Sequence, residues 1–171
     1  MLEKLLVLDV DGTLCPGSKG FDKECQVLKK YFCDIDRTAI KLFKARGWKV
    51  CFLSGDTNIN RQYAGFCEVD FWSSKMSDGT LNKVLVFEDM LRHYKVDIKN
   101  TVVIGDDVVF DGPLCHHITL NGGYAFCPND AHAAILSMVT ARLNSNAGSG
   151  VVMDAYCFFY KDNFDIGEYG H

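Results

Sequence analysis

The stretch Leu5–Thr13, with the sequence LLVLDVDGT, joins an uninterrupted apolar run to two carboxylates that follow it at once. Such a run, ended by turn-forming residues, is typical of a central parallel strand that is buried on both faces. Two further short apolar runs end in the same way, Val50–Leu53 at Ser54 and Val102–Ile104 at Gly105–Asp107. Because the carboxyl ends of parallel strands meet at one edge of a sheet, these three endings predict a polar site there.

Helical patterns alternate with the strands and are separated by turn residues. The helices are expected from an N-cap at Asp36 to a stop at Gly47, over 58–65, from a cap at Asn82 to about Tyr94, and over 131–143. A short strand is expected around Val69–Trp72 and strand-like pieces within 118–126, and the arms 19–22 and 25–32 predict a projecting β-hairpin. This alternation predicts an α/β fold, a doubly wound, Rossmann-like parallel sheet with helices on both faces.

The length and composition fit one folded domain. The chain has 171 residues, of which 48% are hydrophobic and 23% charged. We expect a single domain over 1–155 with the hairpin at about 15–33, followed by a C-terminal tail over 156–171 that carries aromatic anchors.

Charge and cysteine usage narrow the classes of partner and compartment. The net charge is −4, from 18 basic and 22 acidic residues without a basic cluster, which argues against a nucleic-acid partner. No apolar run is long enough to span a bilayer, so no membrane partner is expected. The 8 cysteines are scattered without a Cys-x-x-Cys pair, which favours reduced core thiols and a cytoplasmic protein.

The strand ends bring several carboxylates to one crevice, and this clustering indicates a cation. Asp9 and Asp11 follow the first strand, Asp106 and Asp107 follow a later one, and Lys83 stands at the start of a helix. Carboxylates in one crevice repel each other unless a cation neutralises them. Oxygen ligands without a neighbouring His or Cys favour Mg²⁺ over zinc.

In this order the residues resemble the four motifs of the haloacid dehalogenase (HAD) superfamily of aspartate-nucleophile phosphatases. The motifs correspond to Asp9–Leu14, Ser54 within Leu53–Asp56, Lys83, and Gly105–Asp107. The resemblance implies that Asp9 attacks phosphorus and forms an aspartyl phosphate, and that Asp11 is the general acid and base.

The resemblance also implies how phosphate and metal are held. Mg²⁺ would bind the side chains of Asp9 and Asp106 and the backbone carbonyl of Asp11. Ser54, Gly55 and Lys83 would hold phosphoryl oxygens. Asp107 and Asp111 would support the metal or Lys83 indirectly.

Superfamily members usually carry a cap domain after the first motif or between the second and third. Here both intervals are already filled by the hairpin, helices and strands, which predicts a capless member. Within that group the chain is similar to phosphatases of 3-deoxy-D-manno-octulosonate 8-phosphate and related keto-sugar-acid phosphates, on the stretches 82–107, 127–132 and 147–152. That similarity implies a small sugar or sugar-acid phosphate as substrate and a homotetramer in which a neighbouring subunit closes each active site.

The chain departs from that family at residues that the resemblance assigns to substrate binding. The segment after the first motif is Cys15–Gly17 instead of Thr-Asp-Gly, an Arg-Asp-Gly stretch is Ile35–Arg37, and an Arg of the tail is Met153. Asp36 and Arg37 are the candidates for substrate contacts. Two alternatives stay open: a polynucleotide 3′-phosphatase, since a capless site admits large substrates, and a non-catalytic oligomerisation or regulatory module.

Overall fold

The centre of the computed structural model, which describes residues 3–25, 27–55 and 58–161, is a parallel β-sheet. Its strands are β1 (Lys4–Leu8), β4 (Trp48–Ser54), β5 (Asp70–Ser73), β6 (Thr101–Ile104), β7 (Tyr124–Cys127) and β8 (Ala141–Arg142). They form a 6-stranded sheet in the order β5-β4-β1-β6-β7-β8. The predicted parallel α/β sheet is therefore confirmed.

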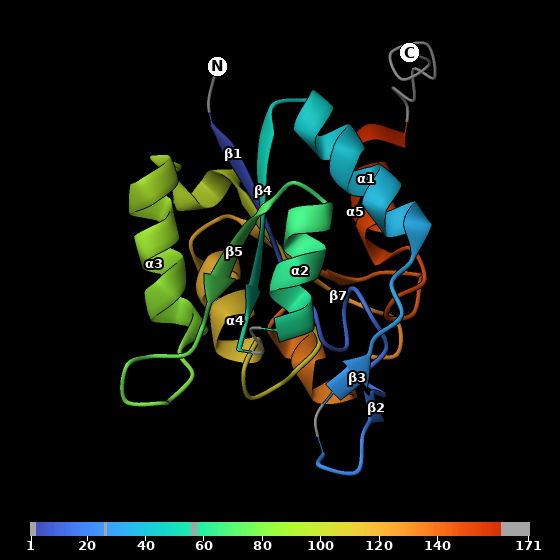
Figure 1. Ribbon diagram of the computed structural model, residues 1–171. Helices are drawn as coiled ribbons and strands as arrows, with labels where there is room; N and C mark the ends of the chain where they lie inside the picture. The colour runs from blue at the N-terminus through green and yellow to red at the C-terminus, as the bar shows by residue number, and fades with distance from the viewer. Residues whose placement is uncertain (1–2, 26, 56–57, 162–171) are drawn as a thin grey trace.

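Helices cover both faces of this sheet (Figure 1). They are α1 (Asp34–Ala45), α2 (Asn58–Phe66), α3 (Lys83–Tyr94), α4 (Gly112–Leu120) and α5 (Val151–Tyr160), with short 3-10 helices at Ile98–Asn100 and Ala133–Ser137. Side chains of α1, α2 and α5 share one apolar core, and those of α3 and α4 share the other. Within the described residues, no helix has the length and apolar character needed to span a membrane.

Strand β1 is the central element because it pairs on both edges and is buried on both faces. It is parallel to β4 on one side and to β6 on the other. Leu6 and Leu8 enter the core under α1, whereas Leu5 and Val7 enter the core under α3, and all four are fully buried. The alternation of a strand thus distributes one apolar run between two cores.

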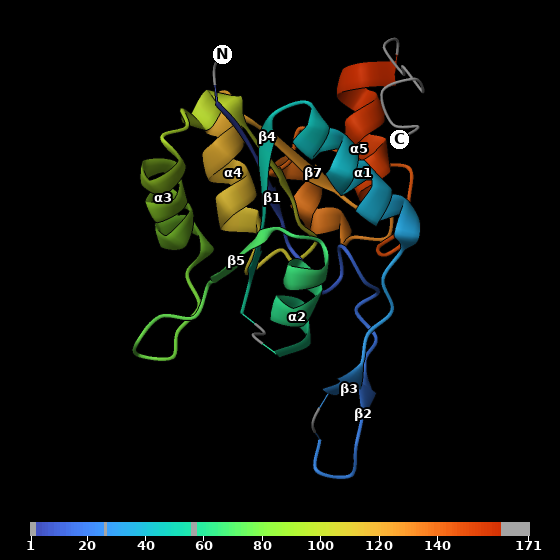
Figure 2. The ribbon, with the colours of Figure 1, turned by 45° about the horizontal axis from the view of Figure 1, so that its top comes forward.

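A two-stranded antiparallel hairpin, β2 (Gly20–Phe21) and β3 (Val27–Lys29), confirms the hairpin expected between the first motif and α1. Figure 2 shows it projecting beyond the carboxyl ends of the parallel strands, away from the helices. In the described residues, the interval between the first two motifs otherwise holds only α1 and β4, so no cap domain is present there.

The predicted N-cap at Asp36 is wrong, because Asp36 lies inside α1. The helix begins at Asp34, with Cys33 as an N-cap that contributes no side-chain hydrogen bond. Asp36 is fully buried, and its carboxylate accepts hydrogen bonds from the backbone N–H of Gly150 (3.1 Å) and of Val152 (2.7 Å). Asp36 therefore caps α5, a helix distant in sequence, and joins it to α1.

After β6, one expectation is confirmed and one is corrected. The strand expected within 118–126 is β7, whereas 118–120 form the end of α4. That helix starts at Gly112 with Pro113 in its first turn, where the missing N–H of proline costs nothing. Residues 131–143 form a 3-10 helix and β8 instead of an α-helix. Backbone bonds from Thr140 N to Ala125 O (2.7 Å) and from Leu143 N to Cys127 O (2.9 Å) draw the segment onto the edge of β7.

The aromatic residues expected in the tail belong to α5, so the boundary expected at 156 falls within a helix. The rest of the expected tail, 162–171, lies outside the described residues. Tyr156 is buried and accepts a hydrogen bond from Arg46 Nε (2.6 Å). Trp48 Nε1 donates to Tyr160 Oη (2.8 Å). These bonds hold α5 against α1 and β4.

All eight cysteines lie in the described residues and carry free thiols. The buried ones are Cys15, Cys51, Cys67, Cys115 and Cys127. The expectation of reduced thiols that pack as small apolar side chains is confirmed for these five.

We expect Asp36→Ala to lower the free energy of unfolding by about 2–3 kcal/mol, because two buried N–H groups at the start of α5 lose their acceptor. Thr38→Ala, an exposed position on the same helix, is the matched control and should change it by less than about 0.5 kcal/mol. Urea unfolding at neutral pH measures both. Equal stability of the two variants would contradict the capping role.

Candidate active site

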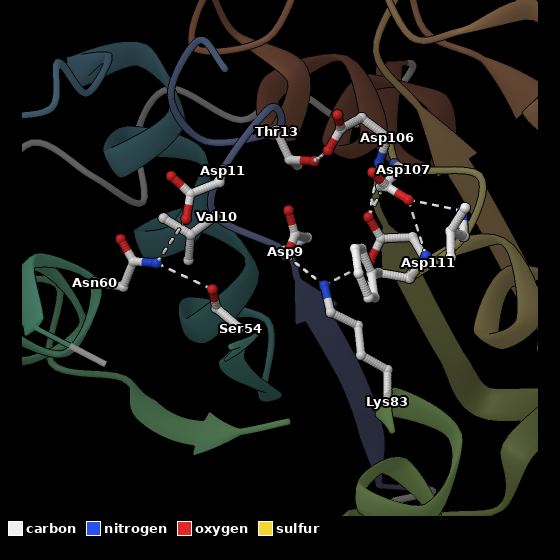
Figure 3. A network of polar contacts seen from close by, with 12 residues as sticks. Asp9, Val10, Asp11, Thr13, Ser54, Asn60, Lys83, Asp106, Asp107 and Asp111 are labelled. Atoms are coloured by element: carbon white, nitrogen blue, oxygen red, sulfur yellow. Dashed lines mark hydrogen bonds and ion pairs between the residues drawn. The ribbon is translucent and has the colours of Figure 1, made fainter. Parts of the chain in front are cut away.

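The carboxyl ends of β1, β4 and β6 meet at one edge of the sheet and carry the polar residues expected there. Asp9 directly follows β1, Ser54 ends β4, and Asp106 lies just beyond β6. Asp9 and Ser54 are buried, and the backbone N–H of Asp9 donates to Ile104 O (3.0 Å), which fixes the first loop against β6. Figure 3 shows Asp9 between two polar networks, one around Asp11 and one around Lys83.

The loop after β1 comes so close to Asp106 that only glycine fits at position 12. Gly12 has φ +83°, and a Cβ there would lie 2.1 Å from Asp106 Oδ2. Thr13 is buried, and its Oγ1 donates to Asp106 Oδ1 (3.3 Å). The Asp-Gly-Thr sequence therefore brings the first and last motifs together through a close backbone approach.

Lys83 connects three segments of the site. It is the first residue of α3, whose N-terminus is capped by Asn82, the side chain of which accepts from Leu85 N. The Lys83 ammonium donates to Asp9 and also to Asp111 Oδ1 (2.6 Å). Burial lowers the pKa of Lys83, but the carboxylates of Asp9 and Asp111 outweigh this effect and leave that pKa above its ordinary value. Lys83 is therefore a fixed positive charge inside the site.

Asp111 and Asp107 shape the loop that carries Asp106. Asp111 is buried, and its Oδ2 accepts from the backbone N–H groups of Asp106 (3.1 Å) and Asp107 (3.0 Å). Asp107 is exposed, and its Oδ1 accepts from Val109 N (2.7 Å) and Phe110 N (2.9 Å). Asp111 thus stands between Lys83 and the loop, whereas Asp107 stabilises the turn before α4.

Three carboxylates are close enough to share a cation. Oxygen atoms of Asp9, Asp106 and Asp111 all lie within 4.8 Å of one another. Burial and the charge of Asp111 raise the pKa of Asp9 well above its ordinary value, despite the opposing pull of Lys83. The same two causes raise the pKa of Asp106 to about 7. One lysine is therefore too little positive charge for this cluster, and a hard divalent cation such as Mg²⁺ fits its oxygen donors.

Asp11 lies in a separate network with a different electrostatic balance. Its carboxylate is contacted by Lys30 Nζ (2.8 and 3.0 Å), Lys19 Nζ (3.1 Å) and Asn60 Nδ2 (3.1 Å). Burial acts to raise the pKa of Asp11, but the hydrogen bonds from Lys30, Asn60 and Lys19 lower it below its ordinary value. Asp9 and Asp11 come from one loop, yet their environments push their pKa values in opposite directions.

A cleft of about 310 Å³ opens between these groups. Its lining includes Asp9, Asp11, Lys19, Ser54, Gly55, Ser74, Leu81, Lys83, Asp107, Phe110 and Asp111. The cleft thus brings the predicted nucleophile, acid/base and phosphate-binding residues to one surface. Asp106 is not among the lining residues and is joined to the first loop by the bond from Thr13.

Asp36 and Arg37 are not among the residues that line this cleft. Asp36 binds the start of α5, and the guanidinium of Arg37 lies over the ring of Phe66, 4.0 Å from its centroid. The candidates for substrate contacts are thus placed on α1, apart from the clustered carboxylates.

Sequence reasoning missed Thr13, Lys19, Lys30 and Asn60 as parts of the site. Lys19 and Lys30 flank the hairpin strands, and Asn60 is a buried residue of α2. The one available signal is the position of Thr13 inside the first motif, since nothing in the sequence ties the hairpin lysines or Asn60 to Asp11.

No family model and no curated protein sequence matches the chain. Solved structures do match it. The cobalt-bound deoxy-D-mannose-octulosonate 8-phosphate phosphatase of Haemophilus influenzae is 26% identical, with a TM-score of 0.81 over 93% of this chain and 88% of that one. The 3-deoxy-D-manno-octulosonate 8-phosphate phosphatase of Moraxella catarrhalis, in complex with magnesium, phosphate and the KDO molecule, is 18% identical, with a TM-score of 0.81 over 95% and 90%.

The corresponding phosphatase of Yersinia pestis is 21% identical, with a TM-score of 0.76 over 91% of this chain and 78% of that one. Other matched structures are assigned to the HAD family or superfamily of hydrolases. The chain therefore has the fold of the HAD hydrolases, as its motifs predict, and its structural neighbours are mainly octulosonate phosphatases.

The raised pKa of Asp106 predicts a pH-dependent stability of the metal-free protein. A carboxyl whose folded-state pKa is about 7 stabilises the fold while it is protonated, and this contribution is lost as pH rises from about 4 to about 7. We compare the free energy of unfolding at about pH 5 and about pH 8 with EDTA present. On going to the higher pH, the unsubstituted chain should lose about 1–3 kcal/mol more of this free energy than Asp106→Asn does.

Asp89→Asn, which changes an exposed carboxylate of α3, serves as the control and should follow the unsubstituted chain at both pH values. Urea unfolding in EDTA gives the free energies. If Asp106→Asn also follows the unsubstituted chain, the electrostatic account of the cluster is wrong.

Proposed function

We propose that this chain is a magnesium-dependent phosphomonoesterase that works through an aspartyl phosphate on Asp9. One observation carries the proposal: Asp9, Asp11, Ser54, Lys83 and Asp111 line one small cleft, and oxygens of Asp106 and Asp111 lie within 4.8 Å of an Asp9 oxygen. The likeness to solved phosphatases, including one that is 26% identical, supports the same reaction class.

In the first step the carboxylate of Asp9 attacks phosphorus while the bond from phosphorus to the leaving oxygen breaks. A new bond joins an Asp9 oxygen to phosphorus, and the leaving oxygen takes a proton from Asp11. Lys83 and Ser54, which flank Asp9 in the cleft, would hold phosphoryl oxygens and offset their charge. A buried ammonium is well suited to this, because it stays charged and fixed in place.

In the second step water attacks the aspartyl phosphate, Asp11 takes a proton from that water, and inorganic phosphate and free Asp9 are released. The lowered pKa of Asp11 in the substrate-free protein keeps this carboxyl ionised and thus able to accept a proton. The acid role needs a higher proton affinity, and a bound phosphoryl dianion would raise the pKa of Asp11 through like-charge repulsion. One carboxyl can thus perform both proton transfers.

Asp9, Asp106 and the backbone carbonyl of Asp11 would hold Mg²⁺, with Asp111 keeping the loop of Asp106 in position. A bound divalent cation supplies charge stabilisation for the transferring phosphoryl group. Two residues of the first loop prepare the site for the cation. Gly12 lets this loop approach the loop of Asp106, and Thr13 orients the Asp106 carboxylate.

The substrate class that fits is a small sugar or sugar-acid phosphate. The cleft measures about 310 Å³ and is lined mostly by charged and polar residues. Lys19 is among them, in addition to the residues proposed to hold the phosphoryl group. The Moraxella structure, which shares this fold, holds magnesium, phosphate and KDO together. We include in the proposal a homotetramer, supported by the exposed aromatic side chains of Phe21 (55% exposed) in β2 and Tyr31 (68%) just after β3.

We expect Asp9→Asn to reduce hydrolysis of p-nitrophenyl phosphate by at least about a thousandfold, because the amide cannot act as the nucleophile. Phosphate release in the presence of Mg²⁺ measures this, and EDTA should abolish the activity of the unsubstituted chain. Asp89→Asn is the control with unchanged turnover, and circular dichroism verifies folding. Turnover retained by a folded Asp9→Asn variant would rule out the proposed mechanism.

A screen of phosphate release across sugar phosphates, keto-sugar-acid phosphates, nucleotides and oligonucleotide 3′-phosphates tests the substrate class. We expect the highest kcat/KM among the sugar and keto-sugar-acid phosphates, since the cleft is small. A preference for oligonucleotide ends would replace the proposed substrate class with the polynucleotide alternative.

A further inference from the structure

Four polar side chains from four separate segments form one connected network on the side of Asp9 away from Lys83. Lys30 follows the hairpin, Asp11 belongs to the first loop, Asn60 lies on α2 and Ser54 ends β4. Lys30 and Asn60 both contact Asp11, they contact each other (2.8 Å), and Asn60 also contacts Ser54 (3.0 Å). Figure 3 shows Asn60 placed between Asp11 and Ser54.

The burial of the Lys30 ammonium is costly in free energy, and its polar partners offset that cost. Its side chain has 0% exposure, although its backbone is partly exposed. The ammonium contacts both oxygens of Asp11, at 2.8 and 3.0 Å, and Asn60 Oδ1 at 2.8 Å. A buried ammonium is costly unless it is paired and its protons are accepted, so this arrangement fixes the lysine and the carboxylate together.

Asn60 is held equally firmly. It is fully buried, its Nδ2 donates to Asp11 Oδ2 (3.1 Å) and to Ser54 Oγ (3.0 Å), and its Oδ1 accepts from Lys30. An amide whose two ends meet a donor and two acceptors has one satisfactory orientation. Asn60 therefore sets the distance between the carboxylate of Asp11 and the hydroxyl of Ser54.

The network does more than neutralise a charge. Lys19 already provides a second ammonium 3.1 Å from Asp11, and its side chain is 24% exposed, which is closer to an ordinary surface ion pair. A carboxylate with one negative charge does not need two ammonium groups and an amide for its charge balance. Lys30 and Asn60 instead restrict the rotation of the carboxylate, as preorganised catalytic groups require.

We propose that Lys30 and Asn60 are positioning residues that aim the Asp11 carboxyl at the leaving oxygen of the substrate, beside the phosphoryl group held at Ser54. This inference rests on the proposed phosphatase function and adds two residues to it. It also ties the hairpin to the chemistry, because Lys30 connects the end of its second strand to the acid/base.

The test compares two leaving groups by kcat/KM, which reports the steps up to release of the alcohol. An alkyl phosphate needs a proton from Asp11, whereas p-nitrophenolate leaves without one. We expect Lys30→Met and Asn60→Ala to lower kcat/KM for an alkyl phosphate such as glycerol 3-phosphate by about 30-fold or more, within the range of general acid catalysis, and for p-nitrophenyl phosphate by less than about threefold. For Lys30→Met the inhibition constant of inorganic phosphate should stay within about twofold, since Ser54 keeps its bond from Asn60.

Lys29→Met, an exposed lysine one position away, is the matched control, and Lys30→Arg should recover part of the alkyl phosphate activity. Thermal unfolding shows whether each variant folds, and Asn60→Ala provides a second variant if Lys30→Met does not. An equal loss on both substrates, or weaker phosphate inhibition of Lys30→Met, overturns the positioning role and leaves the phosphatase function intact. Absence of magnesium-dependent hydrolysis by the unsubstituted chain overturns the proposed function itself.

Discussion

The Lys83 ammonium, placed between the carboxylates of Asp9 and Asp111, is the interaction on which the arrangement of the site depends. It joins the end of β1, the start of α3 and the loop after β6 at one buried point. Asp111 in turn holds the backbone of Asp106. Without this cation, three carboxylates within 4.8 Å would repel each other in a buried setting, and the strand ends could not approach as they do.

The opposite pKa shifts of Asp9 and Asp11 follow from how the chain distributes its lysines. Asp9 shares one lysine with Asp111, and its pKa is raised by burial and by neighbouring carboxylates. Asp11 receives two lysines and an amide, and its pKa is lowered although burial acts against this. The site thus leaves negative charge in excess around Asp9, where a cation would bind, and balances it around Asp11, where the proposed mechanism transfers protons. This separation suits the different roles that we propose for two carboxylates of one loop.

Much of the fold and of the metal side of the site follows from local sequence, because each buried strand is a short apolar run that ends in its polar residue. Leu5–Leu8 and Asp9 are the plainest example. The network around Asp11 does not follow, since Lys30 and Asn60 reach Asp11 through tertiary packing. Asp36 failed as a local helix cap for the same reason: its partners lie on α5, more than a hundred residues away. Residues 131–143 were mistaken for a helix because pairing with β7 overrides helix propensity there.

The two hairpin lysines that contact Asp11 sit at the base of the hairpin, Lys19 just before β2 and Lys30 just after β3. Residues 22–25, beyond β2, are separated along the chain from both lysines by the strands of the hairpin. A change of residues there should therefore leave the contacts of Lys19 and Lys30 with Asp11 in place, as long as the two arms stay paired. The hairpin thus separates an outer end that can change, and so meet a different substrate or partner, from an inner end that is tied to Asp11.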